Sequence, residues 1–313
     1  MFVRSISPAK YISKGEMRME VDKKEYRRKS LEEMNVIDDF LFEEIMADEK
    51  NGIEVCRMIL SLVLKRKIGN IQFRAQKTVP GVSDRSHGIR LDAYVTEGKG
   101  DDISVYDVEP DKRVSHRASL PKRSRYYADL IDVQELGRGV DYEKLPELVT
   151  IFILSYDPFG RKAMYYEAGT VLKTHPDVEY KDGIRRIFLY VDGKLPEGAG
   201  EADKKLRILL RYIKDSTEAN VTDDVTRKLD GIVRETKARK DVGIRFMKSW
   251  EIERDIREEG REEGRKEGRA EGREEGRAEE RAKREQAEKR AADAEARVAE
   301  LEALLAAATK DHV

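Results

Sequence analysis

The sequence predicts an α/β domain with a mixed β-sheet flanked by helices, followed by a charged helical tail. Residues 89–95 and 103–108 alternate apolar and polar side chains, as half-buried strands do, and the glycines between them suit a hairpin turn. Residues 148–156 form a continuous apolar run, which predicts a strand buried on both faces. Glycine then recurs every four residues from Gly260 to Gly276 among arginines and glutamates, which marks the tail.

These patterns divide the chain into three parts. Residues 1–29 mix polar, basic and acidic side chains, and we predict a poorly ordered N-terminus there. Residues 30–250 are predicted to form the folded domain, in which 200–250 is a helical extension. Residues 251–313 contain the glycine repeat and a short coiled-coil-like helix.

Within the domain, the spacing of apolar residues predicts each remaining element. Helical spacing begins near Asp39 and again near Val55, with a turn between them at 48–52. A basic helix follows the hairpin, and helical spacing returns after residue 201 and continues to 250. Further strands are expected at residues 71–79, 163–167 and 184–191.

Composition restricts the classes of partner. The 313 residues are 40% charged and 39% hydrophobic, and the formal net charge is -1, so any contact with DNA requires a local basic patch. The single cysteine, Cys56, excludes an internal disulfide framework and suits a reducing cytoplasm, and its apolar helical setting predicts a structural role.

The sequence lacks the signals of several other classes of protein. No apolar run approaches the roughly 20 residues of a membrane span, and no signal segment opens the chain, so we expect a cytoplasmic protein without a membrane partner. No phosphate-binding loop, zinc-ligand set or Gly-x-Ser-x-Gly motif is present. His87 and His116 have no His or Cys at ligand spacing, and we interpret both as polar loop or helix residues.

Carboxylates gather around the predicted hairpin. Asp92 lies in its first strand, Glu109 ends its second strand, and Asp111 follows two residues later, which puts the last two side chains on one face of an extended chain. Clustered carboxylates repel one another, and a divalent cation with oxygen ligands relieves that repulsion. Asp107 is a possible fourth carboxylate on the same face. The basic segment 112–127 follows directly. Acidic side chains that bind a metal, next to basic side chains that bind a phosphate backbone, suit phosphodiester cleavage.

The segments RLD at 90–92, EPD at 109–111 and RSRYY at 123–127 resemble the PD-(D/E)xK nuclease superfamily. The resemblance is to its branch of transposase-like, recombination-promoting nucleases and covers most of residues 35–280. It implies a restriction-endonuclease-like fold and a DNA endonuclease dependent on Mg²⁺ or Mn²⁺. It also implies that Asp92, Glu109 and Asp111 are the metal ligands and catalytic residues. The chain departs from the pattern at Asp111, where that branch carries Gln or Lys.

Two of these carboxylates have other interpretations. Asp92 is either a metal ligand or a surface residue on the open face of the sheet. Asp111 is either a third ligand or water-orienting group, or the cap of the following turn. Glu109 precedes a proline, which we expect to end strand pairing and expose the end of the strand, a suitable place for a ligand carboxylate.

The basic segment supplies the candidate DNA contacts. On a helix its Arg123 and Tyr127 share a face, and its cations suit phosphate oxygens. The alternative is an ordinary charged helix paired to Asp129 and Asp132. The predicted DNA-binding residues are Arg113, Arg117, Lys122, Arg123, Arg125, Tyr126 and Tyr127.

Two interpretations of the whole chain remain open beside the endonuclease. The first is a catalytically degenerate nuclease fold that binds DNA or a protein partner without cutting. The second, a purely structural oligomerisation protein, depends on the tail. There each glycine costs a helix roughly 1 kcal/mol against alanine, and each Glu–Arg pair returns about 0.2–0.5 kcal/mol. Val298, Leu301 and Leu305 form a short heptad seam, so the tail is either a solvated single helix or a homo-oligomer contact.

Overall fold

The computed structural model describes residues 29–81, 88–99, 102–137 and 139–310. Apart from Lys29, the predicted N-terminal segment lies outside the described residues, as does His87. The chain divides into two compact units, residues 1–246 and 247–313. All of the elements that surround the candidate site belong to the first unit.

The described strands form one six-stranded mixed sheet in the order β1-β2-β3-β4-β6-β5. β1, β2 and β3 pair antiparallel, β3, β4 and β6 pair parallel, and β5 pairs antiparallel with β6. The predicted mixed sheet is therefore confirmed. The strands are β1 (Ile71–Val79), β2 (Ile89–Lys99), β3 (Asp102–Asp111), β4 (Glu147–Leu154), β5 (Tyr165–Ala168) and β6 (Ile184–Tyr190).

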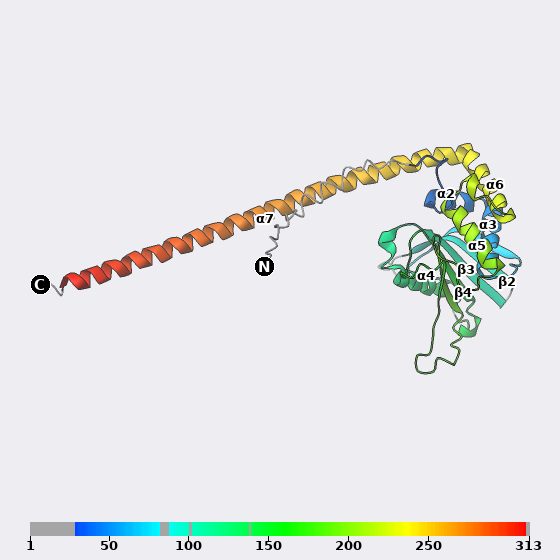
Figure 1. The fold of residues 1–313 in the computed structure, drawn as a ribbon, viewed down its shortest axis with the longest axis horizontal. Helices are drawn as coiled ribbons and strands as arrows, with labels where there is room; N and C mark the ends of the chain where they lie inside the picture. The colour runs from blue at the N-terminus through cyan, green and yellow to red at the C-terminus, as the bar shows by residue number, and fades with distance from the viewer. Residues whose placement is uncertain (1–28, 82–87, 100–101, 138, 311–313) are drawn as a thin grey trace, which may run out of the picture. The chain divides into compact units, whose positions relative to one another are not determined.

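Helices cover both faces of the sheet. Figure 1 shows α4 on one face, and α2, α3, α5 and α6 gathered on the other. Helix α4 is the crossover between the parallel strands β3 and β4, a connection that requires a dozen or more residues. The helices of this unit are α2 (Asp39–Met46), α3 (Glu49–Val63), α4 (Leu120–Glu135), α5 (Glu201–Lys214) and α6 (Asp224–Ala238), with short 3₁₀ turns η1 (Val114–His116), η2 (Tyr142–Lys144) and η3 (Glu218–Asn220).

Strand β4 shows why the sheet has two cores. Its side chains are buried from Leu148 to the end of the strand, as predicted for the continuous apolar run. Val149 and Ile151 join the core beneath α3 and α5, whereas Leu148 and Phe152 face α4. A strand buried on both faces needs no polar alternation, which explains the sequence pattern.

The hairpin strands are longer than the sequence predicts, and the expectation about Pro110 is wrong. β3 continues through Pro110, which pairs with Ile153 of β4, and Glu109 is buried rather than exposed. The β2–β3 pairs end at Ala93 and Val108, so the proline lies where one flank of the strand is no longer paired. A sheet tolerates a residue without an N–H at such a position.

Both predicted N-terminal helices form, but the turn expected at residues 48–52 is shorter, because α2 ends at Met46 and α3 already begins at Glu49. Asp48 separates them, and its side chain accepts the Asn51 N–H at 3.0 Å, which caps α3. Cys56 on α3 is fully buried, and burial raises the pKa of its thiol. The predicted structural role of this cysteine agrees with its position in the core.

The tail forms one helix, α7 (Lys240–Lys310). Its first turns belong to the first unit, where Val242 and Phe246 are buried and the Phe246 ring lies 5.2 Å from that of Phe40. From residue 251 to 302 nearly every side chain is exposed. Trp250 is 40% exposed, and the Arg254 guanidinium lies 5.5 Å from the centroid of its ring. Among the described helices, none combines the length and apolar character that a bilayer span requires.

Candidate functional site

A change of face in the first hairpin positions Asp92. Early in β1, Phe73 packs into the core beneath α2 and α3, but Val79 packs against the α4 side. Strand β2 changes in the same way, with Leu91 on the α4 side and Ala93 in the other core. The switch in β1 lies at Gln76, whose backbone is left-handed with φ +49°, a conformation that a non-glycine residue rarely adopts.

Asp92 lies where β2 makes this switch, and Glu109 lies opposite on β3. The backbone N–H of Asp92 donates a hydrogen bond to Glu109 Oε1 at 2.8 Å. The β2–β3 pairing ends at Ala93 and Val108, so the backbone N–H of Asp92 has no strand partner there. The carboxyl group of Glu109 satisfies this N–H where the two strands separate. The structure thus brings together two of the residues that the sequence predicted as ligands.

Asp107 completes a buried acidic cluster with Asp92 and Glu109. It is fully buried, and neither of its carboxyl oxygens has a hydrogen-bond partner among the described groups. Burial raises the pKa of Asp107 to about 8, and the nearby charge of Asp92 adds to that shift.

The other two members of the acidic cluster also titrate above their ordinary range. Burial raises the pKa of Glu109 well above its usual value, and the charges of Asp107 and Asp92 raise it further. Burial raises the pKa of Asp92 to about 6, with Glu43 and Asp39 adding to the shift and Arg90 opposing it. Near neutral pH the cluster therefore retains protons that an isolated carboxylate has lost.

Helix α2 contributes acidic residues that the sequence analysis missed. Glu43 forms an ion pair with Arg90, and Asp39 forms one with Arg113 at 2.9 Å. Both carboxylates lie near enough to Asp92 to raise its pKa. Their separation of four residues puts them on one face of the helix, but only the packing of α2 against the hairpin shows that this face meets Asp92.

Asp111 has partners of its own. Its carboxylate accepts hydrogen bonds from Arg123 Nη2 at 2.5 Å, the Arg113 backbone N–H at 2.9 Å and the Tyr156 hydroxyl at 3.2 Å. His116 Nδ1 lies 3.1 Å from the same carboxylate. Burial works against the charged form, but the Arg113 N–H and the Arg123 charge hold the pKa of Asp111 below its usual value.

These contacts separate Asp111 from the acidic cluster. The negative charge of Asp111 is balanced by neighbouring protein groups, whereas the carboxyl oxygens of Asp107 have no hydrogen-bond partner among the described groups. In the part of the chain that the structure describes, no three His, Cys, Asp or Glu side chains are arranged so as to hold a metal ion. His116, interpreted from the sequence as a polar loop or helix residue, is part of the Asp111 network.

The predicted DNA-binding residues fall into two sets. Arg123 and Tyr127 share the inner face of α4, as their spacing predicts, and pack against Phe152 at 5.4 and 6.2 Å. Burial, and then the Glu109 charge, raise the pKa of Tyr127 to about 12. The other set is exposed to solvent, and on α4 it occupies the face opposite the buried one; it consists of Arg113, Arg117, Lys122, Arg125 and Tyr126.

Comparison with known proteins adds no relative: no family model, no curated protein and no solved structure matches this chain.

Proposed function

We propose that this chain is a metal-dependent DNA endonuclease whose active site is the acidic cluster of Asp92, Asp107 and Glu109. The observation that supports the proposal best is the hydrogen bond from the Asp92 amide to the Glu109 carboxyl group at the open end of the hairpin. It joins Asp92 to Glu109, seventeen residues away, and the basic segment 112–127 follows Glu109 in the chain. The order of these residues also resembles the PD-(D/E)xK nucleases.

The donor groups suit a divalent cation. Both oxygens of Asp107 are buried without a partner, and the pKa of each carboxyl group in the acidic cluster is raised, so the cluster lacks a positive charge. Carboxyl oxygens are the ligands that Mg²⁺ and Mn²⁺ prefer. Asp92, which is only half-buried, and Glu109 would hold the ion. A divalent cation bound there supplies Lewis acidity and lowers the pKa of a coordinated water.

The remaining groups position the substrate. Arg113, Lys122 and Arg125 are exposed and suit the phosphates of the DNA backbone, and the charge of Asp92 acts on Arg113. We assign to Asp111 the task of holding Arg123, because a carboxylate engaged by a guanidinium and a tyrosine hydroxyl has few oxygen lone pairs left for a cation. This assignment replaces its predicted role as a third ligand.

Cleavage of supercoiled plasmid in Mg²⁺ or Mn²⁺ tests the proposal. We expect nicking by the wild type and a loss of rate of roughly 100-fold in Asp92→Asn and in Glu109→Gln, because each removes a charged ligand. Glu143→Gln, at an exposed carboxylate in η2, is the matched control and should cleave normally. Undiminished nicking by both site variants would show that the activity belongs to other residues or to a contaminant.

The protonated acidic cluster and the engaged Asp111 favour a second candidate, a degenerate nuclease fold that binds DNA without cutting it. Calorimetric titration with Mn²⁺ distinguishes the two. An endonuclease should bind the ion with an affinity that Asp92→Asn lowers at least tenfold. A degenerate fold should give no such binding, while charge-neutralising variants at Lys122 and Arg125 still weaken its affinity for DNA.

A further inference from the structure

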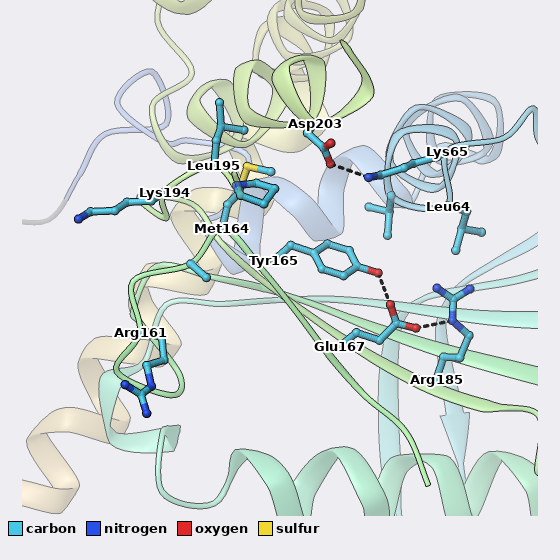
Figure 2. A pocket seen from close by; sticks show the side chains of 13 residues that line it. Leu64, Lys65, Arg161, Met164, Tyr165, Glu167, Arg185, Lys194, Leu195 and Asp203 are labelled. Atoms are coloured by element: carbon cyan, nitrogen blue, oxygen red, sulfur yellow. Dashed lines mark hydrogen bonds and ion pairs between the residues drawn. The ribbon is translucent and has the colours of Figure 1, made fainter. Parts of the chain in front are cut away.

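A pocket of about 510 Å³ lies at the β5 edge of the sheet, away from the acidic cluster. The end of α3, strand β5, the chain that follows β6 and the start of α5 enclose it (Figure 2). Its volume falls within the range of roughly 300–1,000 Å³ that is usual for small-molecule sites. Val63, Leu64, Met164 and Leu195 supply apolar surface, beside the ring of Tyr165.

The carboxylates that line the pocket are already neutralised. Glu167 accepts hydrogen bonds from Arg185 at 2.7 Å and from the Tyr165 hydroxyl at 2.8 Å, a chain that Figure 2 shows along one wall. Asp203 pairs with Lys65 at 2.8 Å. These partners lower the pKa of both carboxyl groups, so both are ionised and engaged at neutral pH.

Two cations that line the pocket remain unpaired. The side chains of Arg161 and Lys194 have no hydrogen bond or ion pair with any described residue, and both are exposed. Figure 2 shows them on the same side of the pocket, directed away from Tyr165. The lining therefore has four cationic side chains against two carboxylates, and its surplus positive charge lies at the rim.

Backbone hydrogen bonds join the two loops that carry these cations. Lys194 donates its N–H to the Lys162 carbonyl at 2.7 Å and accepts the Met164 N–H at 2.9 Å, which joins the two loops. Gly193 makes this crossing possible, because a Cβ there would lie 2.3 Å from Met164 backbone atoms. The loop that carries Arg161 is fixed in turn by Asp157, which accepts the N–H groups of Gly160 and Lys162 at 3.0 and 2.8 Å.

Backbone strain concentrates at the same place. Among the described non-glycine residues, only Lys65, Lys162 and Gln76 adopt a left-handed backbone, and the first two belong to the pocket and its rim loop. Such conformations persist only where the surrounding structure enforces them. The loops that carry the two unpaired cations are therefore held by specific backbone contacts.

We propose that this pocket binds a phosphomonoester with a flat, largely apolar body, the chemistry of a nucleoside monophosphate. The two rim cations match the charge of about −1.5 to −2 that a phosphomonoester carries at neutral pH. Arg161 can hold two phosphate oxygens with its planar guanidinium, and Lys194 adds a point charge. The base and sugar contact Leu64, Tyr165 and Leu195, a part of the pocket that a bare phosphate does not reach.

Calorimetry on the full chain in metal-free buffer tests this proposal with three probes: adenosine monophosphate, adenosine and inorganic phosphate. We expect the monophosphate to bind, and each of the other probes to bind at least about tenfold more weakly, since each lacks half of the contacts. The double variant Arg161→Ala/Lys194→Ala should also bind the monophosphate about tenfold more weakly. The double variant Lys173→Ala/Lys181→Ala, at exposed lysines outside the pocket, is the matched control.

Three results would overturn the proposal. The first is that the monophosphate does not bind at millimolar concentration. The second is that the wild type and the Arg161/Lys194 double variant bind it equally, and the third is that phosphate and the monophosphate bind with equal affinity. The result is independent of DNA cleavage, because Asp92→Asn lies outside the pocket and should bind the monophosphate as the wild type does. A failed nuclease assay and a failed pocket are therefore distinguishable.

Discussion

Two aspartates four residues apart on β3 show how the local environment decides the behaviour of one side chain. Asp107 is fully buried without a hydrogen-bond partner, and its pKa is raised to about 8 from an ordinary 3.8. Asp111 is just as inaccessible to solvent, but four protein groups surround it and its pKa is lowered. Ionisation of Asp107 therefore destabilises the folded state near neutral pH, whereas the charged form of Asp111 stabilises it.

Replacing each aspartate with asparagine should therefore change stability in opposite directions. Because the folded-state pKa of Asp107 is raised, its ionisation opposes folding as pH rises from about 4 to 8. Asp107→Asn should raise the free energy of unfolding by roughly 2 kcal/mol at pH 8 and leave it unchanged below pH 4. Denaturant unfolding in metal-free buffer measures this, and equal effects at both pH values would contradict the assigned titration.

Asp111→Asn should do the reverse. The lowered pKa means that the charged Asp111 stabilises the fold above the ordinary value of 3.8, and that this contribution is lost as pH falls through the lowered pKa. The variant leaves Arg123 without its anion, and we expect a loss of about 2 kcal/mol at pH 7 that disappears in acid. The same unfolding series checks it, and a loss that persists in acid would show that the ion pair is not its cause.

At the scale of the elements, the sheet contains a row of polar residues beneath α4. Asp107 on β3 is aligned with Thr150 on β4, and Thr150 with Arg186 on β6. Each of the three has a buried polar atom without a partner among the described groups. Because these residues come from neighbouring strands, the register of the sheet and not any local motif creates the row.

Thr150 offers a test of this row. Thr150→Val removes a buried hydroxyl without a protein partner and keeps the shape, so we expect stability to rise by up to about 1 kcal/mol. Thr226→Val is the contrasting variant, because the Thr226 hydroxyl donates to Asp223 Oδ1 at 2.7 Å at the start of α6, and it should be destabilising. If Thr150→Val lowers the melting temperature, water bound in the row satisfies the hydroxyl.

At the scale of the whole molecule, the two units differ in how much apolar surface they bury. The first has buried cores on both faces of its sheet, whereas α7 is exposed over nearly all of its length beyond residue 250. Glycine at every fourth position lowers the intrinsic stability of this helix. Among the described side chains from residue 251 to 302 nearly all are exposed, so burial does not offset that cost there.

Deleting residues 251–313 should therefore leave the melting temperature of the first unit within about 2 °C of the full chain, since no core side chain is removed. Circular dichroism measures both the transition and the loss of helix. A large drop in the melting temperature would show that the tail supports the domain. Sedimentation of the full and shortened chains separates the solvated tail from a self-associating one, because only the latter changes the mass with concentration.

The sequence by itself determined the elements, because the period of the apolar residues reports which faces are buried. It identified β4, the hairpin and α4, and it indicated that Asp92 and Glu109 would meet, since antiparallel neighbours lie opposite each other. It failed at Pro110, because whether a proline ends a strand depends on which flank is paired.

The tertiary structure alone decided the partners of the charged groups. Asp111 is engaged by Tyr156, 45 residues away, and Asp92 lies near Glu43 of α2, contacts that no local pattern encodes. The pocket beside β5 likewise joins segments from Val63 to Asp203. Periodicity is a property of neighbours along the chain, whereas electrostatic balance and cavity shape depend on which distant segments pack together, and only the fold determines that.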